Sequence, residues 1–232
     1  MSAEQEIHLN LTANAVDPYL FCRRLCQLAP DKAGIAGGIS LDIVAFSHVA
    51  ELRDDQEFYL SPHAGQLGWD LPAAVGLADT GRFDTVICLT GDGSMMFNLQ
   101  ELATLSSLEN IAIIFFDNDG YNSIRTSQDT HLGGRRFGSD LHWLAFPDWQ
   151  ALSRAFAYRY LEICDNSAID EVKAAMTGRW LVRVKVDPNR GRTPRLVSKI
   201  KDGKFVSPTI FDQFPELPPE LEATYAALKA RL

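Results

Sequence analysis

The sequence lacks the features that would direct it to a membrane, a nucleic acid or an oxidising compartment. Residues 1–16 have neither the basic nor the apolar region of a signal peptide, and no apolar run approaches the roughly 20 residues of a membrane helix. The net charge of -8 argues against nucleic acid or an anionic membrane as the main partner. The four cysteines show no zinc-site spacing, so we expect reduced thiols in a cytoplasmic protein.

Two common nucleotide-binding motifs are also missing. Neither Gly-x-Gly-x-x-Gly nor Gly-Lys-Ser/Thr follows a predicted strand, which counts against dinucleotides and nucleoside triphosphates as ligands.

What is present is an alternation of short apolar runs and helical segments. This pattern predicts a single doubly wound α/β domain, with a mostly parallel sheet flanked by helices. We expect the domain to occupy residues 1–187, and residues 188–232 to form a tail that packs on the domain or on a partner. Strands are predicted at 34–37, 57–60, 85–90, 111–116, 160–164 and 181–186, and helices at 18–28, 40–52, 69–78, 98–108, 149–158 and 167–176, with a polar loop at 127–141.

Polar turns follow two of the predicted strands. The turn GDG at 91–93 comes directly after the apolar run 85–90, and the turn DNDG at 117–120 comes after the apolar run 111–116. Between them, Asn98 with Glu101 is a variant of the capping box and predicts a helix start. A right-handed β-α-β crossover brings both strand ends to the same edge of the sheet, where open α/β sheets bind their ligands.

The residue types at this edge suit a metal-bridged diphosphate. Asp92 offers a carboxylate and Asn118 an amide oxygen, and oxygen ligands of this kind suit Mg²⁺. Gly91 and Gly93 allow backbone amides to approach an anion closely.

The segment from residue 91 to residue 118 resembles the signature of thiamine-diphosphate enzymes, a Gly-Asp-Gly followed at a distance by Asn. A lone Gly-Asp-Gly is more often an ordinary turn, but the interval matches as well. Its SMMFNLQELATL resembles the acetolactate synthase group, and its ENIAIIFFDN resembles the phosphonopyruvate and sulfopyruvate decarboxylases. The resemblance covers nearly the whole chain and implies thiamine diphosphate and Mg²⁺ as cofactors.

The resemblance also implies a set of site residues. The metal ligands would be Asp92, Asn118 and the backbone carbonyl of Gly120. Counting without a gap would make Asp119 the second ligand, but Asp-Asn at 117–118 occurs in the decarboxylase branch and favours Asn118. Further cofactor contacts are expected at Gly91, Gly93, Ser94 and Tyr121.

A second segment, SPHAGQLGWDLPAA at 61–74, resembles the Gly-x-Met-Gly-x-x-Leu-Pro-Ala-Ala segment of the same family. By position Leu67 would be the apolar wedge that bends the cofactor, although it could also be an ordinary core residue. The backbone carbonyl of Gly65 would accept a hydrogen bond from the aminopyrimidine. His63 is a candidate for proton transfer, and Ser40 is either a phosphate contact or a helix N-cap.

A few other polar residues have a weaker case. His131 and His142 could assist proton transfer, and Arg125 or the pair Arg135-Arg136 could hold a substrate carboxylate. Each is more often a surface group in a polar loop.

The resemblance implies an acetolactate synthase-like enzyme that decarboxylates a small 2-oxo acid and transfers the resulting acyl anion to an acceptor. The alternatives are a decarboxylase subunit that releases an aldehyde, and a catalytically silent cofactor-binding or regulatory subunit. In the family a glutamate on a separate pyrimidine-binding domain activates the cofactor, and this sequence has room for only one α/β domain. We therefore expect a split enzyme whose partner subunit supplies the glutamate, as a dimer of heterodimers; a truncated chain is the competing explanation.

Overall fold

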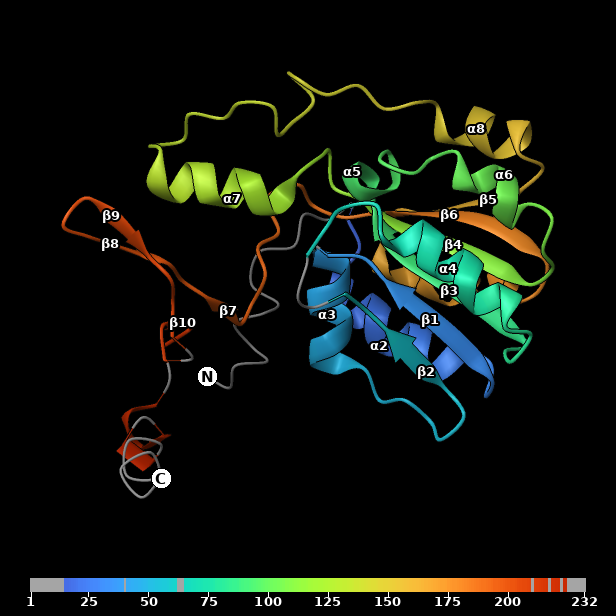
Figure 1. The fold of residues 1–232 in the computed structure, drawn as a ribbon, viewed down its shortest axis with the longest axis horizontal. Helices are drawn as coiled ribbons and strands as arrows, with labels where there is room; N and C mark the ends of the chain where they lie inside the picture. The colour runs from blue at the N-terminus through green and yellow to red at the C-terminus, as the bar shows by residue number, and fades with distance from the viewer. Residues whose placement is uncertain are drawn as a thin grey trace. The chain divides into compact units, whose positions relative to one another are not determined.

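A parallel sheet of six strands organises residues 15–191. The computed structural model describes residues 15–39, 41–61, 65–209, 211–216, 218–221 and 223–224. The strands lie in the order β2-β1-β3-β4-β6-β5, and each neighbouring pair is parallel (Figure 1). They are β1 Ala33–Gly37, β2 Glu57–Tyr59, β3 Thr85–Gly91, β4 Ile111–Asp117, β5 Arg159–Ile163 and β6 Arg179–Lys185. The predicted doubly wound α/β fold is confirmed.

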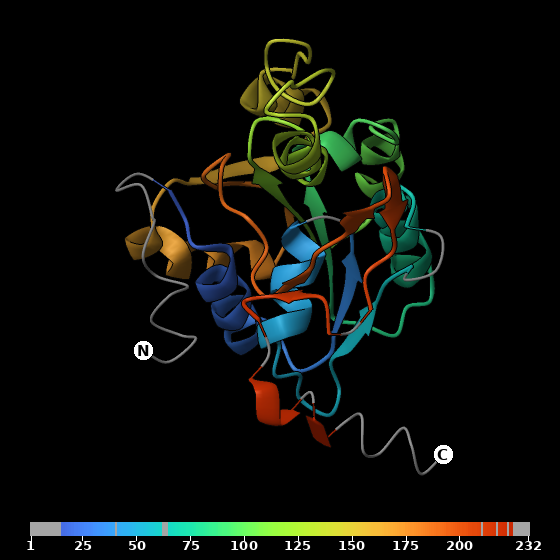
Figure 2. The ribbon, with the colours of Figure 1, turned by 90° about the vertical axis from the view of Figure 1, so that its left-hand side faces the viewer.

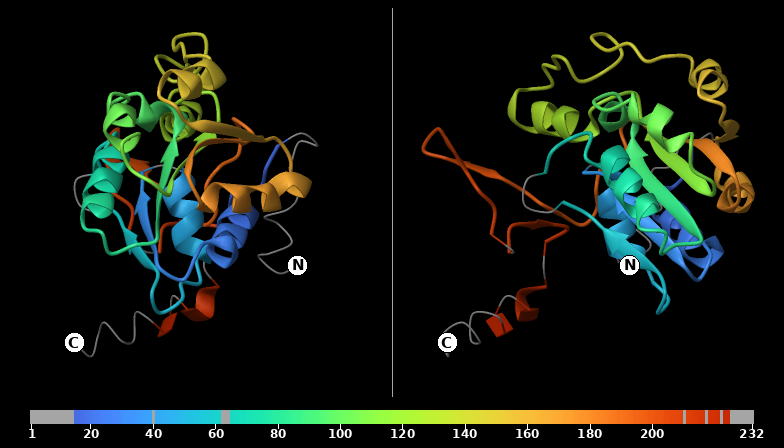
Figure 3. Two further views of the ribbon diagram at one scale, coloured as in Figure 1. Left: turned by 90° about the vertical axis from the view of Figure 1, so that its right-hand side faces the viewer. Right: turned by 45° about the vertical axis from the view of Figure 1, so that its right-hand side comes forward.

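Helices cover both faces of this sheet (Figure 2), and the view from the opposite side gives the same division (Figure 3). Helices α4, α6 and α8 contribute to the core on one face, while α2, α3 and the 3-10 helix η1 pack against one another on the other face. The helices are α2 Pro18–Leu28, α3 Leu41–Val49, α4 Asp70–Asp79, α5 Asp92–Met95, α6 Glu101–Leu105, α7 Asn122–His131, α8 Trp149–Ala155 and η1 Asn166–Met176.

Strands β3 and β4 lie in the middle of the sheet, and every residue in them is buried. Parallel strands that are covered on both faces have nearly continuous apolar sequences, which is why these two strands were evident from the sequence. Their carboxyl ends lead directly into α5 and the turn before α7 (Figure 1).

The start of α2 follows the local chemistry of its sequence. The Asp17 carboxylate accepts hydrogen bonds from the amides of Tyr19 and Leu20 at 2.8 and 2.9 Å. Pro18 occupies the first helical turn, where its missing N–H leaves no bond unmade. The predicted helix at 18–28 is confirmed.

The prediction that Asn98 caps a helix extending to residue 108 is wrong. Helix α6 is shorter, Glu101–Leu105, and its N-cap position is Gln100. Asn98 instead donates through its side-chain nitrogen to the carbonyl of Gly68 at 2.7 Å. The Asn98 side chain, which the local pattern assigned to a helix cap, therefore makes a tertiary contact instead.

The predicted polar loop at 127–141 is also wrong in its first part, because α7 continues to His131. Its single large apolar side chain, Ile124, is 45% exposed, so the segment has no apolar stripe to reveal it. Polar side chains three residues apart, Asn122, Arg125 and Gln128, hold the helix by hydrogen bonds to backbone carbonyls elsewhere in the chain.

Smaller differences concern helix lengths and type. Helix α3 ends at Val49 rather than residue 52, and α8 ends at Ala155 rather than residue 158. The predicted capped helix at 167–176 is the 3-10 helix η1, which Asp165 caps by accepting from the Ser167 amide at 2.8 Å.

The residues from Arg192 onward belong to a second unit. It contains two small antiparallel pairs, β8 with β9 and β7 with β10. Their bounds are β7 Arg195–Leu196, β8 Lys199–Lys201, β9 Lys204–Val206 and β10 Gln213–Phe214. The expectation that residues 188–232 pack on the domain or on a partner stays a prediction. Within the described ranges, no helix combines the length and the apolar character needed to cross a bilayer.

Candidate functional site

The carboxylate of Asp92 joins the ends of the two central strands. Asp92 follows β3 directly and is only 1% exposed. Its Oδ2 accepts hydrogen bonds from the amides of Gly120 at 2.8 Å and Asn118 at 3.2 Å, both beyond β4. Its Oδ1 accepts from the Gly93 amide at 2.6 Å. The two polar turns that the sequence singled out therefore meet at one sheet edge.

Asn118 carries a buried oxygen without a partner. The residue is 4% exposed, and its Oδ1 has no hydrogen-bond partner among the residues described. An unpaired buried polar atom costs roughly 1–3 kcal/mol, and an ion or a water molecule bound there would supply the missing partner. Asp119, the alternative ligand, is only half-buried and has a left-handed φ of 62°.

Two glycines in these turns lie where a Cβ would not fit. A Cβ on Gly93 would lie 2.5 Å from Cε1 of Tyr121, so the Tyr121 ring packs directly over this glycine. Gly120 has a φ of 116°, and a Cβ there would lie 2.8 Å from the carbonyl oxygen of Ser139. Gly91 has no such neighbour within 4 Å.

The electrostatics of the turn favour a cation. Burial, and then the nearby carboxylate of Asp117, raise the pKa of Asp92 to about 8. A divalent cation would compensate the buried negative charge that both effects disfavour. The buried carboxylate of Asp92 and the unpartnered oxygen of Asn118 thus fit a hard metal ion.

Asp117 adds a second carboxylate near Asp92, and the structure contains a compensating charge. Arg183 on β6 contacts the Asp117 carboxylate at 2.5 Å and Glu162 at 3.1 Å. The Asp117 side chain is 5% exposed and that of Arg183 is 23% exposed. The extra carboxylate is therefore neutralised within the fold.

Asp70 is a site residue that the sequence analysis missed. It is fully buried at the start of α4, and its Oδ2 accepts from the hydroxyls of Thr90 and Ser94, each at 2.7 Å. The Ser94 oxygen in turn accepts from the Gly68 amide at 2.9 Å. Burial raises the pKa of Asp70, while these hydrogen bonds oppose that shift. Asp70 therefore ties the 65–70 segment to the end of β3 and to α5.

This network limits the predicted role of Ser94. The only hydroxyl proton of Ser94 is donated to Asp70, so the side chain has none to offer a phosphate oxygen. A cofactor contact through the Ser94 backbone stays a prediction.

The segment expected to bend the cofactor is a loop with two left-handed glycines. Gly65 is exposed with a φ of 58°, and Gly68 is buried with a φ of 79°. Leu67 between them is half-buried and is absent from the buried core, which argues against a role in packing alone. His63 and Ser40 lie outside the described residues.

The hypothesis that Arg125 holds a substrate carboxylate is wrong. The residue is 2% exposed, and its two terminal nitrogens donate to backbone carbonyls. Arg136 is bound to the Asp129 carboxylate at 2.8 Å, and His142 lies beside the ring of Trp143. No contact connects Arg136 or His142 to Asp92 in the described part of the chain.

Replacing Asp70 tests its role in joining the two segments. Asp70→Ala leaves two hydroxyls without their buried acceptor, and we expect it to lower the free energy of unfolding by about 3 kcal/mol. Asp70→Asn retains one acceptor oxygen and should lose about 1 kcal/mol. Chemical denaturation measures both, with the exposed Asp79 on the same helix as control: Asp79→Ala should change stability by less than about 0.5 kcal/mol. Equal effects of Asp70→Ala and Asp79→Ala would contradict this role.

A double-mutant experiment tests the compensation of Asp117. Arg183→Met leaves the Asp117 carboxylate buried and unpaired, and we expect a loss of about 3–5 kcal/mol in the free energy of unfolding. Adding Asp117→Asn removes the stranded charge and should restore most of that loss. If the double variant were as unstable as Arg183→Met alone, the ion pair would not be the reason for the loss.

Comparison with known proteins agrees with this arrangement. The family model described as thiamine pyrophosphate enzyme, C-terminal TPP binding domain, matches residues 41–184. The acetolactate synthase isozyme 2 large subunit of Escherichia coli (strain K12) is 33% identical over 150 residues, covering 62% of this chain and 26% of that protein. The probable acetolactate synthase large subunit of Methanocaldococcus jannaschii is 26% identical over 183 residues, covering 74% of this chain and 31% of that protein.

The matched part spans less than a third of either relative. The family model nevertheless covers more than half of this chain, including α4, both central strands and the two turns that meet at Asp92. The predicted resemblance is thereby confirmed, and the chain belongs to the thiamine pyrophosphate enzymes, within their C-terminal TPP binding domain.

Proposed function

We propose that this chain is the diphosphate-binding subunit of a split thiamine-diphosphate enzyme. The enzyme would decarboxylate a small 2-oxo acid and transfer the acyl unit to an acceptor, as a soluble cytoplasmic assembly. One observation supports the proposal above all: the buried Asp92 carboxylate accepts the backbone amide of Asn118, whose own buried Oδ1 has no partner among the described residues, and both residues follow adjacent parallel strands. Family membership supplies the cofactor class.

In this proposal Mg²⁺ binds to Asp92, to Asn118 Oδ1 and to the Gly120 carbonyl. That carbonyl accepts from the Asn122 amide at 3.1 Å and keeps a second lone pair for a cation. Asn118 is preferred to Asp119 as a ligand because its oxygen is the buried one that lacks a partner. The diphosphate would lie against the backbone at Gly91 and Gly93, where no Cβ intervenes.

Bound thiamine diphosphate would supply the carbon nucleophile that attacks the 2-oxo acid and the electron sink for loss of carbon dioxide. The chain's own contribution is to hold and orient it. Leu67 would press an apolar side chain against the bend of the cofactor, and the exposed Gly65 would offer its carbonyl to the aminopyrimidine. Tyr121 packs over Gly93 and closes one side of the turn.

The activating glutamate would come from a separate pyrimidine-binding subunit, in a dimer of heterodimers. The matched relatives are more than three times as long as the region they share with this chain. The described residues contain one six-stranded parallel sheet and hence one domain of this type. We propose that a second subunit supplies the other domain.

Aldehyde release by a phosphonopyruvate- or sulfopyruvate-type decarboxylase is the second candidate. The observation that favours it is the Asp117-Asn118 pair, with Asp117 held by Arg183. Carboligation remains our first choice because the relatives are acetolactate synthase large subunits.

Titration calorimetry with Mg²⁺ and thiamine diphosphate tests the metal site. We expect binding to the wild-type protein, and losses for Asp92→Ala and Asn118→Ala larger than the roughly 10–100-fold caused by removing outer-shell partners of metals. Asp119→Ala is the matched control and should bind like the wild type. Binding that survives Asp92→Ala, or is lost only in Asp119→Ala, would reject this assignment.

Turnover of a panel of 2-oxo acids tests the need for a partner. The chain alone should release no carbon dioxide, and the chain with a pyrimidine-domain subunit should consume the acid. A new carbon–carbon bond in the product would indicate carboligation, and a free aldehyde would indicate simple decarboxylation. Turnover by the isolated chain would disprove the split arrangement.

A further inference from the structure

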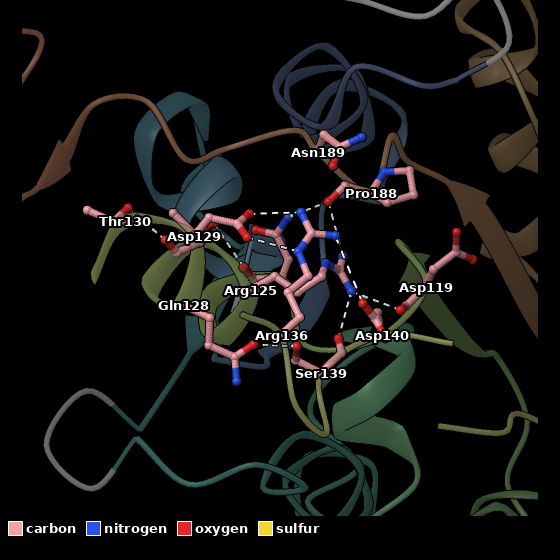
Figure 4. Close-up of polar contacts among 12 residues, drawn as sticks. Asp119, Arg125, Gln128, Asp129, Thr130, Arg136, Ser139, Asp140, Pro188 and Asn189 are labelled. Atoms are coloured by element: carbon pink, nitrogen blue, oxygen red, sulfur yellow. Dashed lines mark hydrogen bonds and ion pairs between the residues drawn. The ribbon is translucent and has the colours of Figure 1, made fainter. Parts of the chain in front are cut away.

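Arg125 occupies the first turn of α7 and binds four backbone carbonyls. Its Nη1 donates to the carbonyl oxygens of Asp119 at 2.8 Å and Ser139 at 2.9 Å (Figure 4). Its Nη2 donates to those of Asn118 at 2.5 Å and Pro188 at 3.0 Å. One guanidinium therefore connects the turn that carries Asn118 to two segments that are distant in sequence.

The side chain has no carboxylate partner. None of the ion pairs in the described residues includes Arg125, whereas Arg136 on the neighbouring loop is bound to Asp129 (Figure 4). Burial lowers the pKa of Arg125, but a guanidinium in a protein stays charged. A buried charge is costly unless it is hydrogen-bonded, and here carbonyl oxygens bind both terminal nitrogens, while Nε has no partner among the described residues.

The turn at 118–120 is held from both sides. The amides of Asn118 and Gly120 point to Asp92, and the carbonyls of Asn118 and Asp119 point to Arg125. Asp119 and Gly120 both have positive φ, and such conformations in a residue other than glycine cost about 1–3 kcal/mol unless the surroundings hold them. The bonds to Arg125 provide that restraint.

Arg125 is itself fixed in place. The Ser139 carbonyl also accepts from the Tyr121 amide at 3.0 Å, and the Pro188 carbonyl also accepts from Asn122 Nδ2 at 3.0 Å. Rotation of the guanidinium away from the turn would break bonds to both segments. The Asn118 and Asp119 carbonyls are thus anchored to the body of the domain.

We propose that Arg125 is a positioning residue for the metal site, holding the Asn118 turn in its binding conformation before a cation arrives. Arg125 would contact neither the metal nor the substrate, and its effect would pass through the backbone of Asn118 and Asp119. This inference rests on the proposed function, because it concerns the same metal site. A preorganised turn leaves less ordering to be done on binding, and affinity rises accordingly.

Lysine substitution separates geometry from charge. Arg125→Lys keeps the positive charge, but one ammonium group cannot reproduce the planar fork that reaches four carbonyls. We expect Arg125→Lys to weaken Mg²⁺ binding by about 10–100-fold, measured by titration calorimetry of the full chain in the presence of thiamine diphosphate. The matched control is Arg136→Lys, which should leave the affinity for Mg²⁺ unchanged.

The outcomes distinguish this inference from the proposed function. If the wild-type protein fails to bind Mg²⁺ with thiamine diphosphate, the proposed function fails. If the wild type binds and Arg125→Lys binds equally well, the positioning role is overturned. A lower free energy of unfolding with unchanged Mg²⁺ affinity would also overturn it, because Arg125 would then serve only stability.

Hydrogen exchange of the wild-type protein keeps the test decisive if the variant does not fold. In metal-free protein the amides of Asn118 and Gly120 should be protected, because the turn is already formed and bonded to Asp92. Rapid exchange of these two amides without metal, followed by protection on adding Mg²⁺ and thiamine diphosphate, would overturn preorganisation by Arg125.

Discussion

The buried carboxylate of Asp92 is the interaction on which the rest of the site depends. Asp92 follows strand β3, and its carboxylate accepts hydrogen bonds from two amides that follow strand β4. These bonds fix how the two polar turns meet. A Cβ on Gly93 would overlap the ring of Tyr121, and a Cβ on Gly120 would overlap the carbonyl of Ser139, so both positions require glycine. The buried carboxyl group of Asp92 and the unpartnered amide oxygen of Asn118 both belong to residues at this sheet edge. We propose that this edge binds a cation.

Three further charged residues surround this centre, and each is satisfied differently. Asp70 accepts hydrogen bonds from two hydroxyl groups and thereby connects α4 to β3 and α5. Asp117 is neutralised by Arg183 from the next strand. Arg125 binds carbonyls and restrains the turn from the side opposite Asp92. Buried charges are costly, and their concentration here, with partners from separate elements, indicates a region that is built for rigidity.

The sequence revealed the strands and the two turns because those features are local. Buried parallel strands appear as apolar runs, and glycine beside a carboxylate marks a turn. The sequence could not reveal contacts between residues that are distant along the chain. Asp70 meets Thr90 and Ser94 only in the folded protein. Asn98 does not cap a helix, because its side chain binds the carbonyl of Gly68. Helix α7 was not predicted, because polar side chains hold it in place of an apolar stripe. The partners of Arg125 are backbone carbonyls, which every residue has, so the sequence alone could not identify them.

In the proposed function, Asp92 and Asn118 together bind the metal of the cofactor diphosphate. The most direct measurement is a crystal structure of the protein with Mn²⁺ and thiamine diphosphate, using the anomalous signal of Mn²⁺ to locate the ion. We expect one strong anomalous peak at about 2.0–2.3 Å from Asp92, Asn118 Oδ1 and the Gly120 carbonyl, in octahedral geometry. A peak bound by Asp119 or by another cluster, or diphosphate density away from this sheet edge, would contradict it.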